Sequence, residues 1–310
     1  MGASRADGQF LGIDIGSVSF SYVLIDQNGT ILQSDYLFHH GNIYGLLRKT
    51  LDRLDLSLVQ QVAYNHKSGD FFTAGVSVNE QVSLIEGALF QQADIGSMFV
   101  IGGETFGLIL FDEQNRYRRY IANSSCAAGT GGFLDQQAER LGLSDSAELS
   151  RLADSFQGEP PKIATRCAVF AKTDLVHCQQ QGYSLEAICA GLCQGLAHTI
   201  ADTLVKGVIL REPVLAVGGV SNNPKVMQYL AEVIGSPLVI PHFSAITGAI
   251  GCALMARSRA PDLARARQFS PETLLKQQNQ VKHYFFAPLT PRLSVVPDFA
   301  AHPRYVSHNV

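Results

Sequence analysis

Residues 15–26 read IGSVSFSYVLID, and residues 101–112 read IGGETFGLILFD. The two stretches align without a gap and share isoleucine, glycine, phenylalanine, leucine and aspartate at matching positions. A repeat of this kind inside one chain is typical of a duplicated structural unit. The chain is therefore predicted to contain two similar halves.

The segments that flank the repeat are also alike. Each copy follows a predicted strand, at 10–15 and 98–101, and a turn leads to a further strand, at 30–38 and 116–122. Asn-Gly between alternating apolar runs, as at Asn28-Gly29, indicates a hairpin. Each half should therefore open with strand, glycine turn, strand, hairpin and strand.

The rest of the pattern fits two α/β halves. Apolar residues recur at helical spacing, and Val214–Val217 reads as a short buried strand that runs into Gly218-Gly219. Asn223 before Pro224 is the favoured start of a helix. The expected divisions are a first half at 1–93, a second half at 94–244, a helix that returns to the first half at 245–258 and a weakly patterned tail or linker at 259–310.

Composition narrows the class of protein. The 310 residues carry a net charge of −3 and are 46% hydrophobic, so a full core is possible and a basic surface for nucleic acid is not expected. No apolar run reaches the ~18 residues of a membrane span. The first ten residues contain no apolar signal region. We expect a cytoplasmic protein that binds neither nucleic acid nor membrane.

The segment NSSCAAGTG at 123–131 places Cys126 before a turn of small residues and an amphipathic helix. A thiolate at the start of a helix lies beside free N–H groups, which lowers its pKa and favours metal ligation or nucleophilic chemistry. A buried structural cysteine beside a tight turn is the alternative. The six cysteines form no Cys-x-x-Cys pair, so a metal site must gather cysteines distant in sequence or come from two chains.

The glycine turns suit a nucleotide triphosphate. After the first strand, Gly16 lets backbone N–H groups face a phosphate, Ser17 can donate a hydroxyl, and Asp14 can hold hydrated magnesium. Gly102-Gly103 and Gly218-Gly219 follow two further predicted strands. The three turns together predict a cleft that binds ATP or ADP with Mg²⁺ between the halves.

These residues carry a family resemblance. The duplicated motifs resemble the superfamily of actin, hexokinase and the ATPase heat-shock chaperones, which implies an α/β fold of two duplicated ribonuclease-H-like halves. Within it, the chain looks like the activators of 2-hydroxyacyl-CoA dehydratases, which are related to the ATPase subunits of benzoyl-CoA reductase. The matching segments cover most of 10–256: LGIDIGS (11–17), IGG (101–103), CAAGTG with FL (126–134), CAVFA (167–171), VGGVSNN (217–223) and ITGAIGCAL (246–254).

The resemblance implies a dimeric ATPase that transfers electrons. Such activators are homodimers that hold one 4Fe–4S cluster between subunits, and the matching ligands here are Cys126 and Cys167. ATP binding and hydrolysis open the dimer, and a low-potential electron passes to an acceptor dehydratase or reductase. Catalytic roles fall to Asp14, which also holds magnesium, and Glu104. The expected nucleotide contacts are Gly16, Ser17, Val18, Ser19, Gly102, Gly103, Gly129, Thr130, Gly131, Gly218, Gly219, Val220, Asn222 and Gly248.

The chain departs from the family pattern at both phosphate motifs. Where the family has Thr-Thr and a lysine after the first serine, this chain has Val18, Ser19 and Ser21. Val100 replaces the aspartate that begins the second motif. These changes are expected to affect the rate of ATP hydrolysis more than the binding of nucleotide. The chain also resembles the activator-like domains at the front of longer fused proteins.

Two other functions stay open. One is a kinase of the same superfamily that phosphorylates a sugar or another hydroxyl compound. It needs a catalytic base, for which Asp70 and Asp94 are the candidates. The other is a nucleotide-sensing domain that does not hydrolyse ATP, which the replacement of aspartate by Val100 favours.

Overall fold

The computed structural model describes residues 8–123, 130–165, 168–260 and 268–277. The first half is a five-stranded sheet in the order β3-β2-β1-β4-β5. Its strands and helices are β1 (Gln9–Ile15), β2 (Ser19–Ile25), β3 (Ile31–Phe38), α1 (Ile43–Leu51), η1 (Leu56–Leu58), β4 (Val59–Asn65), η2 (His66–Phe71), β5 (Val76–Val78) and α2 (Glu80–Gln91).

The second half repeats this topology. Its sheet has the order β8-β7-β6-β9-β10, with antiparallel pairs from β6 to β8 and parallel pairs from β6 to β10. The elements are β6 (Ser97–Ile101), β7 (Phe106–Phe111), β8 (Tyr117–Ala122), α3 (Gly131–Arg140), α4 (Ser146–Ser155), α5 (Ala168–Gln180), α6 (Leu185–Leu204), β9 (Val214–Val217), η3 (Gly219–Asn222), α7 (Pro224–Ile234), β10 (Leu238–Val239) and η4 (Ser244–Ile246). The expected duplicated α/β fold is confirmed.

The repeat extends to individual hydrogen bonds. The N–H of Gly16 donates to Ser19 O at 2.8 Å, and the N–H of Gly102 donates to Thr105 O at the same distance. The hairpins that follow begin at Asp26 and Asp112, whose carboxylates each accept from two backbone N–H groups. The matching sequence therefore encodes matching turns.

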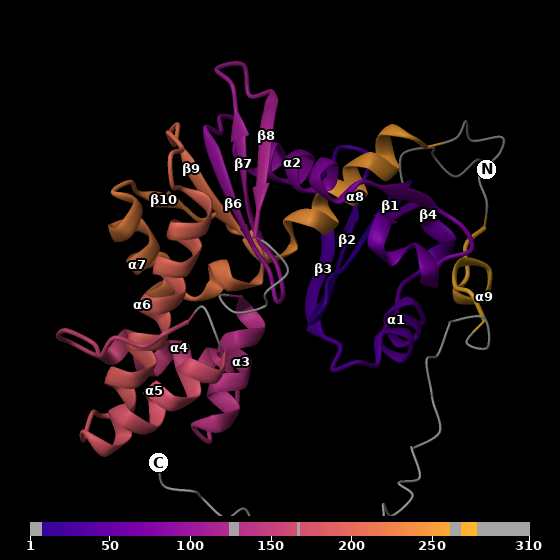
Figure 1. The fold of residues 1–310 in the computed structure, drawn as a ribbon. Helices are drawn as coiled ribbons and strands as arrows, with labels where there is room; N and C mark the ends of the chain where they lie inside the picture. Colours follow the sequence, from indigo (N-terminus) through magenta and orange to yellow (C-terminus); the bar gives the residue numbers. More distant parts are fainter. Residues whose placement is uncertain (1–7, 124–129, 166–167, 261–267, 278–310) are drawn as a thin grey trace, which may run out of the picture.

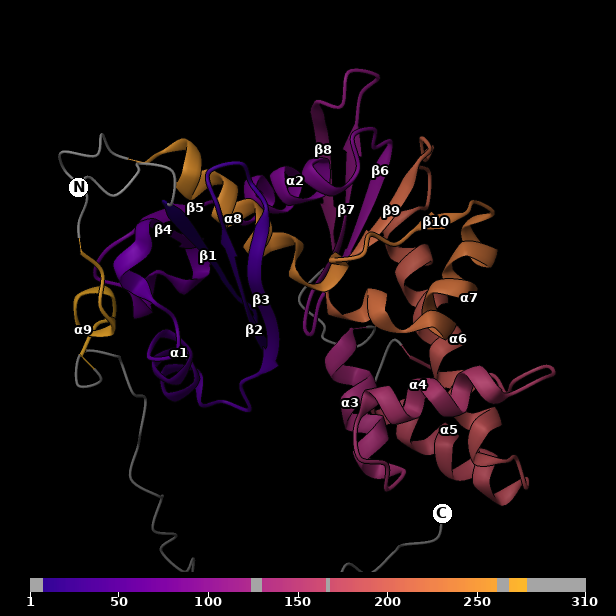
Figure 2. The ribbon, with the colours of Figure 1, turned by 180° about the vertical axis from the view of Figure 1, so that it is seen from behind.

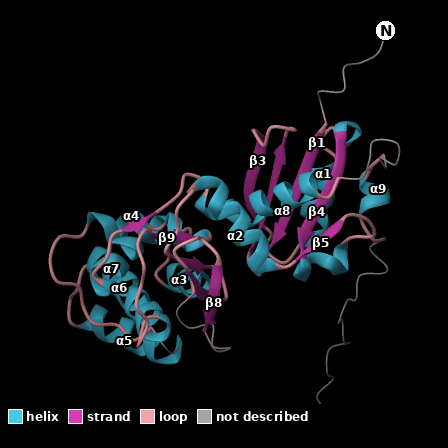
Figure 3. Cartoon of the chain, turned by 90° about the horizontal axis from the view of Figure 1, so that it is seen from above, coloured by secondary structure: helices cyan, strands magenta, loops and turns pink. Residues whose placement is uncertain are grey.

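The two halves exchange a helix. Helix α2 follows the first sheet but packs against the second, where Ala88 shares a core with Met98 and Ile109. Helix α8 (Thr247–Ser258) follows the second sheet but packs against the first, where Ile250 shares a core with Val23. Figures 1 and 2 show α2 and α8 side by side between the two sheets, and Figure 3 shows them from above.

Glycines let these helices approach closely. A methyl group on Gly12 of β1 would lie 2.1 Å from Ala249 O, so α8 rests directly on this strand. A methyl group on Gly251 of α8 would lie 1.7 Å from Ser83 O of α2. Because no larger residue fits there, the contact between the two helices depends on glycine.

Helices α1, α6 and α7 cover the outer faces of the sheets. Leu47 and Leu51 of α1 are buried against the first sheet, and the long α6 buries Leu192 and Leu196 in the core of the second half. The predicted helix start at Asn223 is confirmed, since its side chain accepts from Val226 N, and Ser184 caps α6 by accepting from Ala187 N. The sequence reading had missed β4 and β5.

Part of the C-terminal region packs on the first half. A short helix, α9 (Pro271–Leu274), is followed by an antiparallel bridge between Leu275 and Phe72. Phe269, Leu274 and Leu275 are buried in the same core as α1. In the part of the chain that the structure describes, no helix is long and apolar enough to cross a membrane.

Candidate nucleotide site

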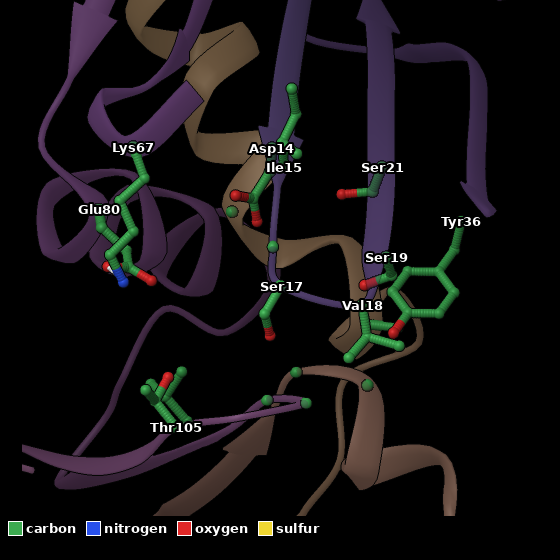
Figure 4. A pocket seen from close by; sticks show the side chains of 18 of the residues that line it. Asp14, Ile15, Ser17, Val18, Ser19, Ser21, Tyr36, Lys67, Glu80 and Thr105 are labelled. Carbon is green, nitrogen blue, oxygen red and sulfur yellow. Dashed lines mark ion pairs between the residues drawn. The ribbon is translucent and has the colours of Figure 1, made fainter. Parts of the chain in front are cut away.

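A cavity of about 440 Å³ lies where the two sheets face each other. The strands β1, β4 and β5 of the first half end at this cavity, as do β6 and β9 of the second. Ligands in α/β proteins bind outside the carboxyl ends of parallel strands, because loops and helix starts meet there. We call this space the Asp14 cavity, after the carboxylate in its wall (Figure 4).

Asp14 faces α8 because side chains alternate along β1: Leu11 and Ile13 point into the α1 core, and Gly12 lies against α8. Asn65, at the end of the neighbouring parallel strand β4, donates its amide N–H to the Asp14 carboxylate. A methyl group on Gly248 would lie 2.3 Å from Asp14 Oδ2. The backbone of α8 therefore closes one side of the carboxylate.

The electrostatics of Asp14 follow from these neighbours. Burial, followed by the negative charge of Glu80, raises the pKa of Asp14 from 3.8 to about 7, although the positive charge of Lys67 opposes this rise. A carboxylate that is costly to ionise in a protein pocket is stabilised by a bound cation. The site therefore favours a metal ion or another positive charge beside Asp14.

The two glycine turns meet across the cavity. A methyl group on Gly103 would lie 2.5 Å from Val18 Cγ2 and 3.3 Å from Ser17 Oγ. The N–H groups of Gly131 and Gly132, at the start of α3, donate to the carbonyls of Gly102 and Gly103 at 3.0 and 2.7 Å. The first turn of α3 thus holds the second glycine turn in place.

A short ion pair borders the cavity on the other side. Lys67 is the second residue of η2, and its Nζ lies 2.6 Å from Oε2 of Glu80, at the start of α2 (Figure 4). Both side chains line the Asp14 cavity. The side chain of Lys67 is 61% exposed, so it is free to change its partner.

A second cavity, of about 220 Å³, adjoins the first. We call it the Asp135 cavity; the first turns of α3, residues 146–150 of α4 and the loop at 219–223 line it. Val18, Tyr36, Gly103 and Gly219 line both cavities. The Tyr36 hydroxyl lies against Gly219, where a methyl group would be 2.3 Å away. A contact between the halves therefore separates the two spaces.

With this geometry in place, the comparisons with known proteins identify the family. Residues 11–256 match the BadF/BadG/BcrA/BcrD ATPase family. The chain belongs to this family. The match includes both glycine turns, Asp14 and the whole of η3.

Proteins named as dehydratase activators are similar to most of the chain. The 2-hydroxyisocaproyl-CoA dehydratase activator of Clostridioides difficile is 28% identical over 260 residues, which are 81% of this chain and 96% of that protein. The activator of lactoyl-CoA dehydratase of Anaerotignum propionicum is 26% identical and covered to 98%. A solved structure of the Clostridium difficile activator with bound ADPNP has a TM-score of 0.72 at 26% identity, over 81% of this chain and 95% of that one.

The structure of this family member gathers most of the predicted nucleotide contacts. Residues at the Asp14 cavity are Asp14, Gly16, Ser17, Val18, Ser19, Gly102, Gly103, Glu104, Gly218, Gly219 and Gly248. Residues at the Asp135 cavity include Gly131, Val220 and Asn222. Thr130 is buried at the start of α3 and lines neither cavity. Gly129, Cys126 and Cys167 lie outside the described residues.

Sequence reasoning missed several polar side chains at the site, among them Asn65, Lys67, Tyr36 and His39. Asn65 ends a strand that was not predicted, and Lys67 follows it in η2. His39 is buried and its Nε2 lies 3.3 Å from Gly16 O, behind the first glycine turn. Their position in the sequence could have indicated them, because polar residues that directly follow an apolar strand often meet at one edge of a sheet.

The remaining cysteines have no chemical role in this site. Cys178, Cys189, Cys193 and Cys252 are free and buried. Burial raises the pKa of Cys189 and of Cys193 to about 12, so neither thiol ionises readily. Over the described ranges, no group of three or more His, Cys, Asp and Glu side chains could hold a metal ion.

Neither candidate base for a kinase lies in the Asp14 cavity. Asp70 has a side chain that is 96% exposed and lies 4.0 Å from Lys276 Nζ. Asp94 Oδ1 lies 3.5 Å from Arg211 Nη1, and Asp94 lines neither cavity. A base must reach the hydroxyl beside the terminal phosphate, so these two residues give the kinase hypothesis no support.

Proposed function

We propose that the protein binds and hydrolyses ATP at the junction of its halves, and that it uses hydrolysis to activate an acceptor enzyme. The observation that carries the proposal is the Asp14 cavity, in which two equivalent glycine turns from the duplicated halves face each other beside a carboxylate. Phosphates fit the Asp14 cavity, and the adenosine fits the adjoining Asp135 cavity. The similarity to an activator structure with bound ADPNP supports nucleotide binding by this fold.

Each residue then has a role that follows from its chemistry. The N–H groups of Ser17 and Gly103 donate to no described residue, so they can bind phosphate oxygens. Bound magnesium would neutralise phosphate charge next to Asp14. The Asp14 carboxylate would orient magnesium-bound water, and Glu104, exposed at the opposite turn, would supply a second acidic group. Gly248 leaves room for Asp14 because it lacks a side chain.

The class of acceptor enzyme is inferred from the relatives, which are named as activators of 2-hydroxyisocaproyl-CoA dehydratase and of lactoyl-CoA dehydratase. We infer that Cys126 and Cys167 from each of two subunits hold a 4Fe–4S cluster, which supplies a low-potential electron when bound. The helices α3 and α5 follow these cysteines in sequence and pack in one core through Phe133, Leu134 and Ala171. A homodimer supplies the four thiolates that a cluster normally takes.

The first experiment measures nucleotide binding and turnover. Titration calorimetry with ADP and MgCl₂ should give one site per chain, and ATP should be hydrolysed at a rate that Asp14→Ala reduces more than it reduces ADP binding. The absence of binding heat at millimolar ADP would overturn the nucleotide proposal. Binding without measurable ATP turnover would instead favour a nucleotide-sensing domain, a role that Val100 at the end of β6 makes reasonable.

The second experiment tests the cluster. Protein purified without oxygen should contain iron and sulfide, and Cys126→Ser or Cys167→Ser should remove the iron and weaken the dimer without loss of ADP binding. Cys189→Ser, in the buried interior of α6, is the control and should keep its iron. Sedimentation and iron analysis of the four proteins decide the matter, and a Cys126→Ser protein with full iron content would refute the assignment.

A further inference from the structure

The Asp14 cavity has a basic side chain that the glycine turns do not supply. We propose that Lys67 binds the phosphates of the nucleotide, and that the segment Phe269–Lys276 positions Lys67 by holding the loop that carries it. This inference rests on the proposed nucleotide function. It identifies Lys67 as the source of the positive charge that a polyphosphate requires. It also gives a role to a segment that lies beyond residues 11–256, the part of the chain that matches the family.

The charge balance of the cavity points to Lys67. Three carboxylates line the cavity, those of Asp14, Glu80 and Glu104, and Lys67 is the one basic side chain among the described lining residues. The first glycine turn contributes only serine hydroxyls and backbone N–H groups. A di- or triphosphate beside three carboxylates would be strongly repelled without a compensating cation. Lys67 is the protein group placed to provide it.

The present partner of Lys67 leaves it available. The ammonium group lies 2.6 Å from Glu80 Oε2 and has three N–H donors, so one carboxylate does not saturate it. Both side chains are well exposed, at 61% and 42%, and exposed ion pairs are weak. An arriving phosphate can therefore share or replace Glu80 as the partner of Lys67.

The loop that carries Lys67 is held from outside by the C-terminal segment. Thr73 N donates to Leu274 O and Lys276 N donates to Phe71 O, both at 2.9 Å, so the segment adds a short antiparallel bridge to the loop. Lys276 Nζ also donates to Gly69 O at 3.3 Å. The loop between Lys67 and Thr73 therefore lies between the cavity and this segment.

Side chains anchor the segment to the body of the first half. Phe269, Leu274 and Leu275 are buried in the α1 core, and Glu272 forms an ion pair with Arg48 of α1. Phe71, whose carbonyl accepts from Lys276, lines the Asp14 cavity together with Lys67. Because the segment holds the loop at Gly69, Phe71 and Thr73, its loss should free Lys67 before it unfolds the sheet.

The test of Lys67 compares ligands with and without phosphate. Affinities for Mg·ADP and for adenosine are measured in the wild type, Lys67→Met, Lys67→Arg and Lys49→Met, where Lys49 is an exposed lysine of α1 outside both cavities. Lys67→Met should weaken ADP by about tenfold or more, as for a lost hydrogen bond to a charged group. Adenosine affinity should be unchanged, Lys67→Arg should recover much of the loss, and Lys49→Met should behave as wild type.

The test of the segment uses a double-mutant cycle. Leu274→Asp disrupts the anchor, and Lys276→Pro, which removes the N–H that Phe71 O accepts, is the milder alternative if the first protein does not fold. Each should weaken ADP binding in the wild-type background at a temperature where the protein is folded. In the Lys67→Met background the same change should cause little further loss, because the segment acts through Lys67.

The outcomes separate this inference from the proposed function. A wild-type protein that binds neither ADP nor adenosine would contradict the nucleotide function itself. Normal ADP binding by Lys67→Met would overturn the role of Lys67 while leaving that function intact. If the double variant loses ADP affinity by the product of the losses in Lys67→Met and Leu274→Asp, the two residues act independently. That result would overturn the positioning role of the segment.

Discussion

Asp14 shows how strongly one side chain depends on its neighbours. The sequence places it at the end of a strand, but the pKa of about 7 comes from burial against α8 and from the charge of Glu80. Its pKa in the folded protein exceeds the ordinary value of 3.8, so the folded state binds the proton more tightly. The free energy of unfolding therefore falls as the pH rises from about 4 to about 7.

The first prediction concerns this titration. Magnesium requires the ionised carboxylate, so Mg·ADP should bind more tightly at pH 8 than at pH 6, and calorimetry in buffers of different ionisation enthalpy should show proton release near pH 7. In Asp14→Asn the proton release should disappear, and the nucleotide-free protein should gain thermal stability relative to wild type at pH 8. Asp154→Asn, at an exposed position of α4, is the control. Undiminished proton release in Asp14→Asn would contradict this assignment.

The sequence predicted the site residues that belong to a recognisable pattern, and it missed the site residues that belong to none. Gly16 and Gly102 are visible because they lie in a repeat, and Gly218 is visible because it follows a buried strand. Lys67 and Tyr36 carry no such pattern. They reach the site only because β4 runs parallel to β1 and because β3 borders the second half, and both facts are tertiary.

Among the elements, the exchanged helices α2 and α8 link the halves. Each packs on the sheet of the other half, and they touch at Gly251 and Ser83, where no side chain fits. A rotation of one half relative to the other must change this contact. The sequence predicted the helix at 245–258 and located it in the first half, but it did not show that α2 covers the second sheet.

The second prediction tests that contact. Gly251→Val should clash with the α2 backbone and lower the free energy of unfolding by about 1–3 kcal/mol, as in other overpacked interiors. It should also weaken ADP binding, because α8 carries Gly248 beside Asp14. Chemical denaturation and calorimetry measure the two effects, with Ser258→Ala on the exposed end of α8 as the control. A Gly251→Val protein of unchanged stability would show that the helices can separate freely.

The strands show why short elements are harder to predict than long ones. β4, with the sequence VQQVAYN, lacks strict alternation of apolar and polar residues, and β5 has only three residues. Both are stabilised by parallel pairing with strands distant in the sequence. Helices such as α6 carry their own periodicity and caps, so local sequence was sufficient to predict them.

At the scale of the whole molecule, the duplication explains the cleft, and the departures from symmetry determine the chemistry. Asp14 and Val100 occupy equivalent places at the ends of β1 and β6, yet only the first can bind a cation. The connection from β8 to β9 holds four helices, α3 to α6, whereas the equivalent connection from β3 to β4 holds only α1 and the short η1. The first half therefore provides Asp14, and the second half provides the larger helical surface.

The contact between Tyr36 and Gly219 has a kinetic consequence. A nucleotide that occupies both cavities would cross the place where this contact joins the halves, so we expect its entry to require that the contact opens. In stopped-flow mixing, the observed association rate should level off at high ADP concentration, at the rate with which the halves part. Tyr36→Phe should raise that plateau, whereas Tyr117→Phe, on the exposed edge strand β8, should not. An association rate that stays linear in ADP concentration would mean that the contact between Tyr36 and Gly219 does not limit entry. If the rate does level off, the plateau gives the frequency with which the two halves part.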